Sequence, residues 1–175
     1  VILDHFADLT TAKKRYLTDE ELKSFENYLE NINFQLSYGE VVGIGGLAGQ
    51  GQNSLLLALS GCVKAQKGEI LLDGKPVKLG NPKQAMDHGI VLVPEERATE
   101  GLVLELSIAD NLLLPCLSKI TRAGFIDRQK EKKLLDHAVE SLSIKVGDIQ
   151  NPVKSLSGGN QQKVVLAKLM MLEPK

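Results

Sequence analysis

A glycine-rich stretch between two apolar segments constrains the fold of this chain more than any other feature of its sequence. The stretch, GGLAGQGQ, follows the apolar run Val41–Ile44 and precedes the helix-like sequence NSLLLALSG. Four residues separate Gly46 from Gly51, which is the glycine spacing of a loop that joins a strand to a helix and holds a phosphate. The sequence therefore predicts a buried strand, a tight loop and a helix, which together begin an α/β domain.

The predicted phosphate loop lacks the charged residue that such loops normally carry. Gln52 occupies the position of the usual lysine, and Asn53 occupies that of the usual magnesium-binding hydroxyl. An amide oxygen can also bind a hard cation, so Asn53 is the candidate metal ligand. Losing one cation about 4 Å from a phosphate costs on the order of 4 kcal/mol at an effective dielectric constant of about 20. The alternative is a glycine-rich turn without a ligand. The candidate nucleotide-binding residues are Gly46, Gly49, Gly51, Gln52, Asn53 and Ser54.

The remaining sequence alternates strand-like and helix-like segments. GEILLDGKPV predicts a hairpin with Asp73–Gly74 at its turn, and IVLVP predicts a second buried strand. Pro82, Ser107 and Asp127 are placed to begin helices, and Gly61 is placed to end one. This order of segments predicts an α/β domain with a mostly parallel sheet.

Charge and hydropathy exclude some classes of protein. The 175 residues carry a net charge of −1, which gives no electrostatic basis for binding nucleic acid. The most apolar run, GLVLELSIADNLLLPCL, contains Glu105, Asp110 and Asn111. Charged and amide side chains inside this run argue against a membrane span. We therefore expect a globular domain that has no nucleic-acid partner and reaches a membrane only through another protein.

A second glycine-rich motif precedes the last helix-like segment, in SLSGGNQQKVVLAKL. A serine hydroxyl, glycine N–H groups and the start of a helix together form a second cradle for an anion. The simpler alternative is a helix N-cap followed by flexible glycines. The motif closely resembles the ABC-transporter signature, whose core is L-S-G-G-Q, with Asn160 in place of the final glutamine. The signature candidates are Leu156, Ser157, Gly158, Gly159, Asn160 and Gln161.

The order of segments from Asn31 onward resembles one branch of the ABC family. GEVVGIGGLAGQGQNSLLLALSG, GIVLVPEERATEGLVLELSIADNLLLP, GFIDR and LSGGNQQKVVLAK resemble the C-terminal nucleotide-binding domain of the tandem ATPase subunits that power bacterial importers of ribose, galactose, arabinose or xylose. The resemblance implies a P-loop NTPase fold of the ABC ATPase type, with a mostly parallel core sheet, an antiparallel β portion and a helical subdomain. It divides the chain into a poorly matched segment 1–30, a P-loop core with the β portion at 31–100, a helical subdomain at 101–160 and a helix at 161–175.

The resemblance also implies cofactors, partners and one further site residue. Glu95 stands where ABC domains usually carry the Q-loop glutamine, which links the nucleotide to the membrane subunit. The alternative is a solvated loop formed by Glu95, Glu96 and Arg97. The implied cofactors are ATP and Mg²⁺. The implied partners are a second ABC domain (the N-terminal half of the same subunit or a second copy), an integral membrane permease and, indirectly, a substrate-binding protein. The implied location is peripheral, on the cytoplasmic face of the cell membrane.

The catalytic elements that follow the signature in this family have no counterpart before Lys175. The chain therefore resembles an ABC domain truncated before its Walker B strand, and we expect it not to hydrolyse ATP by itself. In ABC dimers the signature of one domain closes over the phosphate loop of the other. We expect a weak nucleotide site at Gln52 and an intact signature that completes the partner's site. Three alternatives remain: a nucleoside importer, a nucleotide-sensing pseudo-ATPase, and a soluble ABC protein acting on ribosomes or DNA, against which the net charge of −1 argues.

Overall fold

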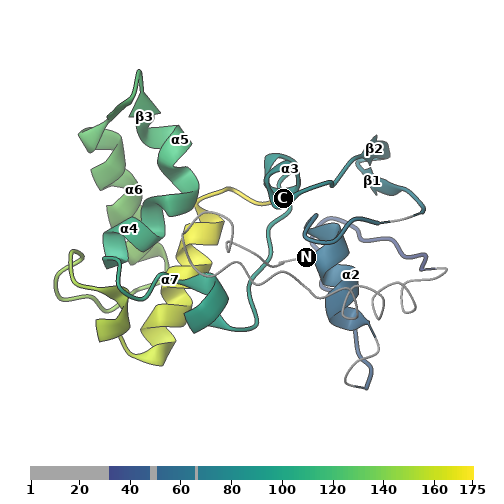
Figure 1. The fold of residues 1–175 in the computed structure, drawn as a ribbon, viewed down its shortest axis with the longest axis horizontal. Helices are drawn as coiled ribbons and strands as arrows, with labels where there is room; N and C mark the ends of the chain where they lie inside the picture. Colours follow the sequence, from purple (N-terminus) through teal and green to yellow (C-terminus); the bar gives the residue numbers. More distant parts are fainter. Residues whose placement is uncertain (1–31, 48–50, 66) are drawn as a thin grey trace. The chain divides into compact units, whose positions relative to one another are not determined.

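The structure, a computed structural model, describes residues 32–47, 51–65 and 67–175. The described residues fall into two compact units that meet in the sequence between Leu92 and Val93. The predicted boundaries at residues 100 and 160 stay predictions, and segment 1–30 lies outside the described residues. Figure 1 shows the order of the helices and strands along the chain.

The described part of the first unit contains an antiparallel hairpin between two helices. In chain order these elements are α2 (Gln52–Leu59), β1 (Ile70–Leu72), β2 (Lys75–Val77) and α3 (Pro82–Asp87). The hairpin pairs Ile70 with Val77, and its turn residues Asp73 and Gly74 have φ angles of 52° and 73°. Two successive left-handed residues are characteristic of the type I′ turn, whose twist matches that of antiparallel strands. The predicted hairpin and its turn are therefore confirmed.

The leucines of α2 form the core of the first unit. Leu57 and Leu92 are buried together, and partly buried apolar side chains surround them: Leu56, Leu59, Cys62, Val63 and Ile90. Gly61 follows the end of α2 with a φ of 74°, and a Cβ atom there would lie 2.6 Å from the carbonyl oxygen of Asn81. Only glycine fits both this conformation and this close approach. The predicted end of the helix at Gly61 is confirmed.

The predicted parallel core sheet is not formed by the described residues. Their sheets are two antiparallel pairs, and Val41–Ile44 has no regular secondary structure, with Val41 96% exposed. IVLVP gives no strand beyond a single bridge position at Val91. A strand forms only when its N–H and C=O groups pair with a neighbouring strand. Among the described residues, none supplies a backbone hydrogen bond to Val41–Ile44, so the apolar run remains irregular and exposed.

The second unit consists mainly of helices. Its α-helices and strands are α4 (Ile108–Leu113), α5 (Leu117–Ile120), β3 (Thr121–Arg122), β4 (Phe125–Ile126), α6 (Arg128–Ser141) and α7 (Gly158–Met170). Its described residues also form three short helical turns, Arg97–Gly101, Leu114–Cys116 and Val153–Ser155. Helix α4 packs against both α6 and α7, and Ile108, Leu112, Val164 and Val165 are almost completely buried. Across the described ranges, no helix is both long and apolar enough to cross a membrane.

A buried asparagine fixes the loop that leads into α4. Asn111 is fully buried, and its Oδ1 accepts a hydrogen bond from the N–H of Val103 over 2.8 Å. Its Nδ2 donates to the carbonyl oxygens of Val103, Leu106 and Ser107, over 3.0, 3.3 and 2.9 Å. Every polar atom of this amide is therefore satisfied, as buried polar groups must be.

Candidate functional site

The predicted phosphate loop is described on both sides of residues 48–50, so Gly49 lies outside the described residues. Gly51 immediately precedes α2 and has a φ of 91°, a conformation that favours glycine. The side chain of Gln52 reaches back to Leu47, because its Nε2 donates to the carbonyl oxygen of that residue over 3.3 Å. Gly46 is exposed. The amide that replaces the usual lysine is thus engaged with the backbone of its own loop.

The first turn of α2 has N–H groups for which the described part of the chain supplies no acceptor. Gly51 provides no side-chain cap, and the N–H groups of Gln52, Asn53 and Ser54 have no acceptor among the described residues. These groups lie at the positive end of the helix dipole, where an anion is favoured. Asn53 is exposed and Ser54 is buried. Within the described ranges, no three His, Cys, Asp or Glu side chains gather as a metal site, so Asn53 remains a single candidate oxygen ligand.

The predicted signature forms the start of α7. Ser157 is the residue before the helix, and Ser157, Gly158 and Gly159 are exposed. The Ser157 hydroxyl makes no capping bond to the first turn; its Oγ instead accepts from Asn160 Nδ2 over 3.2 Å. A Cβ atom added to Gly159 would meet no atom within 4 Å. These three predicted signature residues therefore lie together at an accessible helix start.

These two helix starts differ from those of three other helices. A side chain accepts a hydrogen bond from the first turn of α3, α4 and α6: Asn81, Ser107 and Asp127 do so respectively. The predicted helix starts at Ser107 and Asp127 are thus confirmed. Neither α2 nor α7 has such a side-chain cap. The two glycine-rich motifs therefore lie at helix starts whose first N–H groups are open to an outside acceptor.

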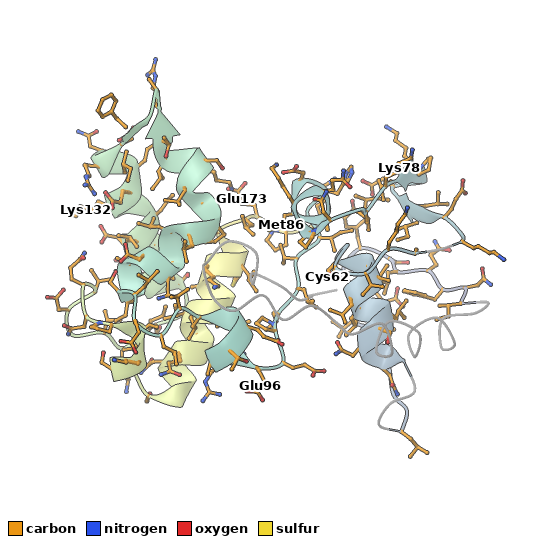
Figure 2. The ribbon with its side chains drawn as sticks, in the orientation of Figure 1. Cys62, Lys78, Met86, Glu96, Lys132 and Glu173 are labelled. Carbon is orange, nitrogen blue, oxygen red and sulfur yellow. The ribbon has the colours of Figure 1, made fainter. Side chains whose placement is uncertain are left out.

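The sequence did not indicate where the side chain of Arg97 lies. Its Nε donates to Oε1 of Gln161 over 3.3 Å, and a Cβ atom on Gly158 would lie 2.9 Å from its Nη2. Glu95 is exposed, and Glu96, labelled in Figure 2, immediately precedes the π-helical turn Arg97–Gly101. Arg97 and Gln161 are 64 residues apart, so no local pattern in the sequence could predict their contact.

A buried lysine lies farther along α7. Lys168 is only 2% exposed, and its Nζ donates to the carbonyl oxygen of Gly101. Burial lowers the pKa of this ammonium from 10.5 to about 8, because the apolar surroundings disfavour its charged form. A lysine within the apolar run VVLAKLMML is the pattern that could have predicted a buried charge.

A sequence profile described as ABC transporter matches residues 29–175, which include both glycine-rich motifs. The chain belongs to the ABC transporter family. The match confirms the resemblance and the P-loop NTPase fold class of the ABC ATPases. Their parallel sheet is still not among the described residues.

Curated members of this family include close relatives. Ribose import ATP-binding protein RbsA 1 of Mesorhizobium japonicum is 47% identical over 87% of this chain, and that of Rhizobium etli is 47% identical over 93%. The ribose import ATP-binding protein of Geobacillus kaustophilus is 42% identical over 83% of the chain. These alignments cover 30%, 32% and 30% of the three relatives. The chain thus spans less than a third of their length.

Proposed function

We propose that this chain is an ATP-binding, energy-coupling half-domain of a bacterial ABC importer for a monosaccharide. The observation that carries the proposal is the exposed, uncapped signature Ser157–Gly159 at the start of α7, in a chain of the ABC family. The names of the relatives, which are ribose import ATP-binding proteins, support a sugar as the cargo. The partners are a second ABC domain and a membrane permease, which in turn meets the substrate-binding protein. The chain then works at the cytoplasmic face of the membrane.

The chain's own phosphate loop is proposed to be the weaker of two nucleotide sites. Gly51 and the open N–H groups of the first turn of α2 fit a phosphate, and the exposed Asn53 offers an oxygen to Mg²⁺. ATP supplies the phosphates and Mg²⁺ supplies a compensating charge. Gln52 brings no charge, and its amide is held by Leu47. Without a cation about 4 Å from the phosphate, the site loses on the order of 4 kcal/mol, roughly a thousandfold in occupancy.

The signature is proposed to complete the stronger site, which lies on the partner domain. The Ser157 hydroxyl and the N–H groups of Gly158 and Gly159 are accessible donors at the positive end of α7. Packing within this chain does not require a glycine at position 159, because a Cβ atom there would meet open space. A phosphate that approaches the backbone closely does require one. Glu95, exposed before the π-helical turn, is the proposed link to the permease.

Substitutions in the complete tandem subunit that contains this chain test the division between the two sites. Ser157→Arg is expected to abolish ATP hydrolysis, because it places a long cationic side chain where the partner's phosphates must approach. Gln52→Ala is expected to retain most of the activity, because the weak site contributes little turnover. Ser155→Arg is the matched control, since Ser155 is also exposed, lies two residues away and donates to the carbonyl oxygen of Pro152.

The measurement is the rate of phosphate release from ATP by each variant of the tandem subunit, reconstituted with its permease. Equal loss from Ser157→Arg and Gln52→Ala would contradict the division of labour. Full activity of Ser157→Arg would contradict the role of the signature itself. Uptake of ribose, compared with uptake of a nucleoside, into vesicles that carry the complete transporter decides the class of cargo.

A further inference from the structure

The π-helical turn Arg97–Gly101 lies along the signature helix and contacts it at both ends. At the start of α7, the guanidinium of Arg97 contacts Gly158 and Gln161. Farther along, a Cβ atom on Gly101 would lie 3.0 Å from a methyl group of Val165. The carbonyl oxygen of Gly101 also accepts a hydrogen bond from the buried Lys168. All of these residues belong to the second unit, so the turn and α7 form one packed assembly.

Arg97 occupies an electrostatically unfavourable position. Its guanidinium lies beside the N-terminus of α7, which carries the positive end of the helix dipole. In the part of the chain that the structure describes, no carboxylate forms an ion pair with Arg97; its one hydrogen bond runs to the neutral amide of Gln161. Ion pairs among the described residues therefore do not explain the position of Arg97. Its contacts with Gly158 and Gln161 at the start of α7 hold it there.

The contact between Arg97 and Gln161 continues to the backbone of the signature. Gln161 Oε1 accepts from Arg97 Nε, while Gln161 Nε2 donates to the carbonyl oxygen of Leu156 over 3.0 Å. This chain of hydrogen bonds joins Arg97 to the residue immediately before Ser157. Only one orientation of the amide satisfies both bonds, because Arg97 can only donate and a carbonyl can only accept. Gln161 therefore fixes the peptide that leads into the signature.

Gly158 lies close to the guanidinium of Arg97. A Cβ atom there would lie 2.9 Å from Arg97 Nη2, closer than such atoms normally approach. At position 159 the same addition would meet nothing. A side chain at position 158 would therefore displace the guanidinium of Arg97, whereas one at position 159 would not.

We propose that Arg97 is a positioning residue for the signature. Through Gln161 it orients the Leu156 peptide, and with it the donors of Ser157–Gly159. The hydrogen bond between Lys168 and Gly101 holds the other end of the same turn. The turn therefore keeps the guanidinium of Arg97 beside the start of α7. This role rests on the proposed function of the signature.

Kinetics of the complete tandem subunit with its permease test this role. Arg97→Ala and Gln161→Ala are each expected to lower kcat for ATP about tenfold, with a smaller change in KM, because a misplaced donor acts mainly in the transition state. The double variant is expected to be no slower than either single variant, because both changes interrupt one chain of bonds. Arg128→Ala is the matched control, since Arg128 is an exposed arginine on α6 that pairs with Glu131 of the same helix.

The variant Gln161→Glu tests whether Arg97 orients the signature peptide or only attaches the π-helical turn to α7. This variant keeps an acceptor for Arg97 and makes it charged, but it loses the donor to the Leu156 carbonyl. If Arg97 acts through the signature peptide, Gln161→Glu is as slow as Gln161→Ala. If Arg97 only attaches the turn to the helix, Gln161→Glu keeps the wild-type kcat, and the proposal is wrong. Far-UV circular dichroism confirms that each variant is folded before its kinetics are compared.

A parallel assay of Ser157→Arg distinguishes a failure of this inference from a failure of the proposed function. If Ser157→Arg remains active, the signature role itself is wrong. If Ser157→Arg is inactive while Arg97→Ala retains the wild-type kcat, only the positioning role is wrong. Multiplicative losses from Arg97→Ala and Gln161→Ala would also overturn it, because independent effects multiply.

Discussion

Replacing the buried Lys168 with methionine is expected to change how the stability of the chain depends on pH. The ammonium is 2% exposed, and burial lowers its pKa from 10.5 to about 8. Because one pKa unit corresponds to about 1.4 kcal/mol, this lowering corresponds to roughly 3 kcal/mol of cost for burying the charged form. Methionine is unbranched and apolar, and it removes the charge while filling much of the same volume.

The sign of the pH dependence follows from the two pKa values. Below about pH 8 the lysine is protonated in both the folded and the unfolded chain, so the full cost of burial is present. Between about pH 8 and 10.5 the folded chain has released the proton while the unfolded chain still holds it. The free energy of unfolding of the wild-type chain therefore rises by roughly 3 kcal/mol over this interval from this one group. Lys168→Met lacks this contribution.

At neutral pH the two proteins are expected to be similar in stability. The charged hydrogen bond from Lys168 to the Gly101 carbonyl contributes about 1.5–3 kcal/mol to stability. Losing this bond in Lys168→Met offsets most of the stability gained by removing the buried charge. The decisive quantity is therefore the difference between wild type and variant as a function of pH. Urea unfolding followed by far-UV circular dichroism measures it, because this signal reports mainly on helices, most of which belong to the second unit.

A second lysine on α7 provides the control for this measurement. Lys163 is half-buried and also donates to a backbone carbonyl, that of Ser143, over 2.9 Å. Lys163→Met is expected to leave the wild-type pH dependence in place. The reasoning is refuted if the difference between wild type and Lys168→Met is the same on both sides of the interval from about pH 8 to 10.5.

Three further substitutions test the local contacts by the same unfolding assay. Gly61→Ala is expected to destabilise the first unit by about 2 kcal/mol or more, because the new Cβ would lie 2.6 Å from the Asn81 carbonyl oxygen. Gly124→Ala, at a φ of 85° but in open space, isolates the backbone cost, and equal losses would contradict the steric argument. Asn111→Leu is expected to cost about 1–3 kcal/mol, because the partly buried N–H of Val103 loses its acceptor; an unchanged midpoint would refute this. Asp127→Ala is expected to cost about 1 kcal/mol by removing the cap of α6, and a neutral effect would show that the cap is dispensable.

Residues close together in the sequence determined many of the elements that the structure contains. Asp73–Gly74 predicted a hairpin turn, Ser107 and Asp127 predicted helix starts, and Gly61 predicted a helix end; each is confirmed. These predictions succeed because caps and tight turns depend on the φ angles and hydrogen bonds of a few neighbouring residues. The two glycine-rich motifs belong to the same class, since each is one local loop that begins one helix.

Only the tertiary structure decided which distant residues meet. The apolar run Val41–Ile44 has the composition of a buried strand, yet a strand needs a neighbour, and the described residues provide none. The sequence around Arg97 indicates no distant partner for it, but packing of the π-helical turn brings it to Gln161. The sequence pattern places Lys168 on a helix, but the tertiary structure shows that its ammonium donates to the carbonyl oxygen of Gly101. Contacts across many tens of residues depend on how whole elements pack, which no short stretch of sequence encodes.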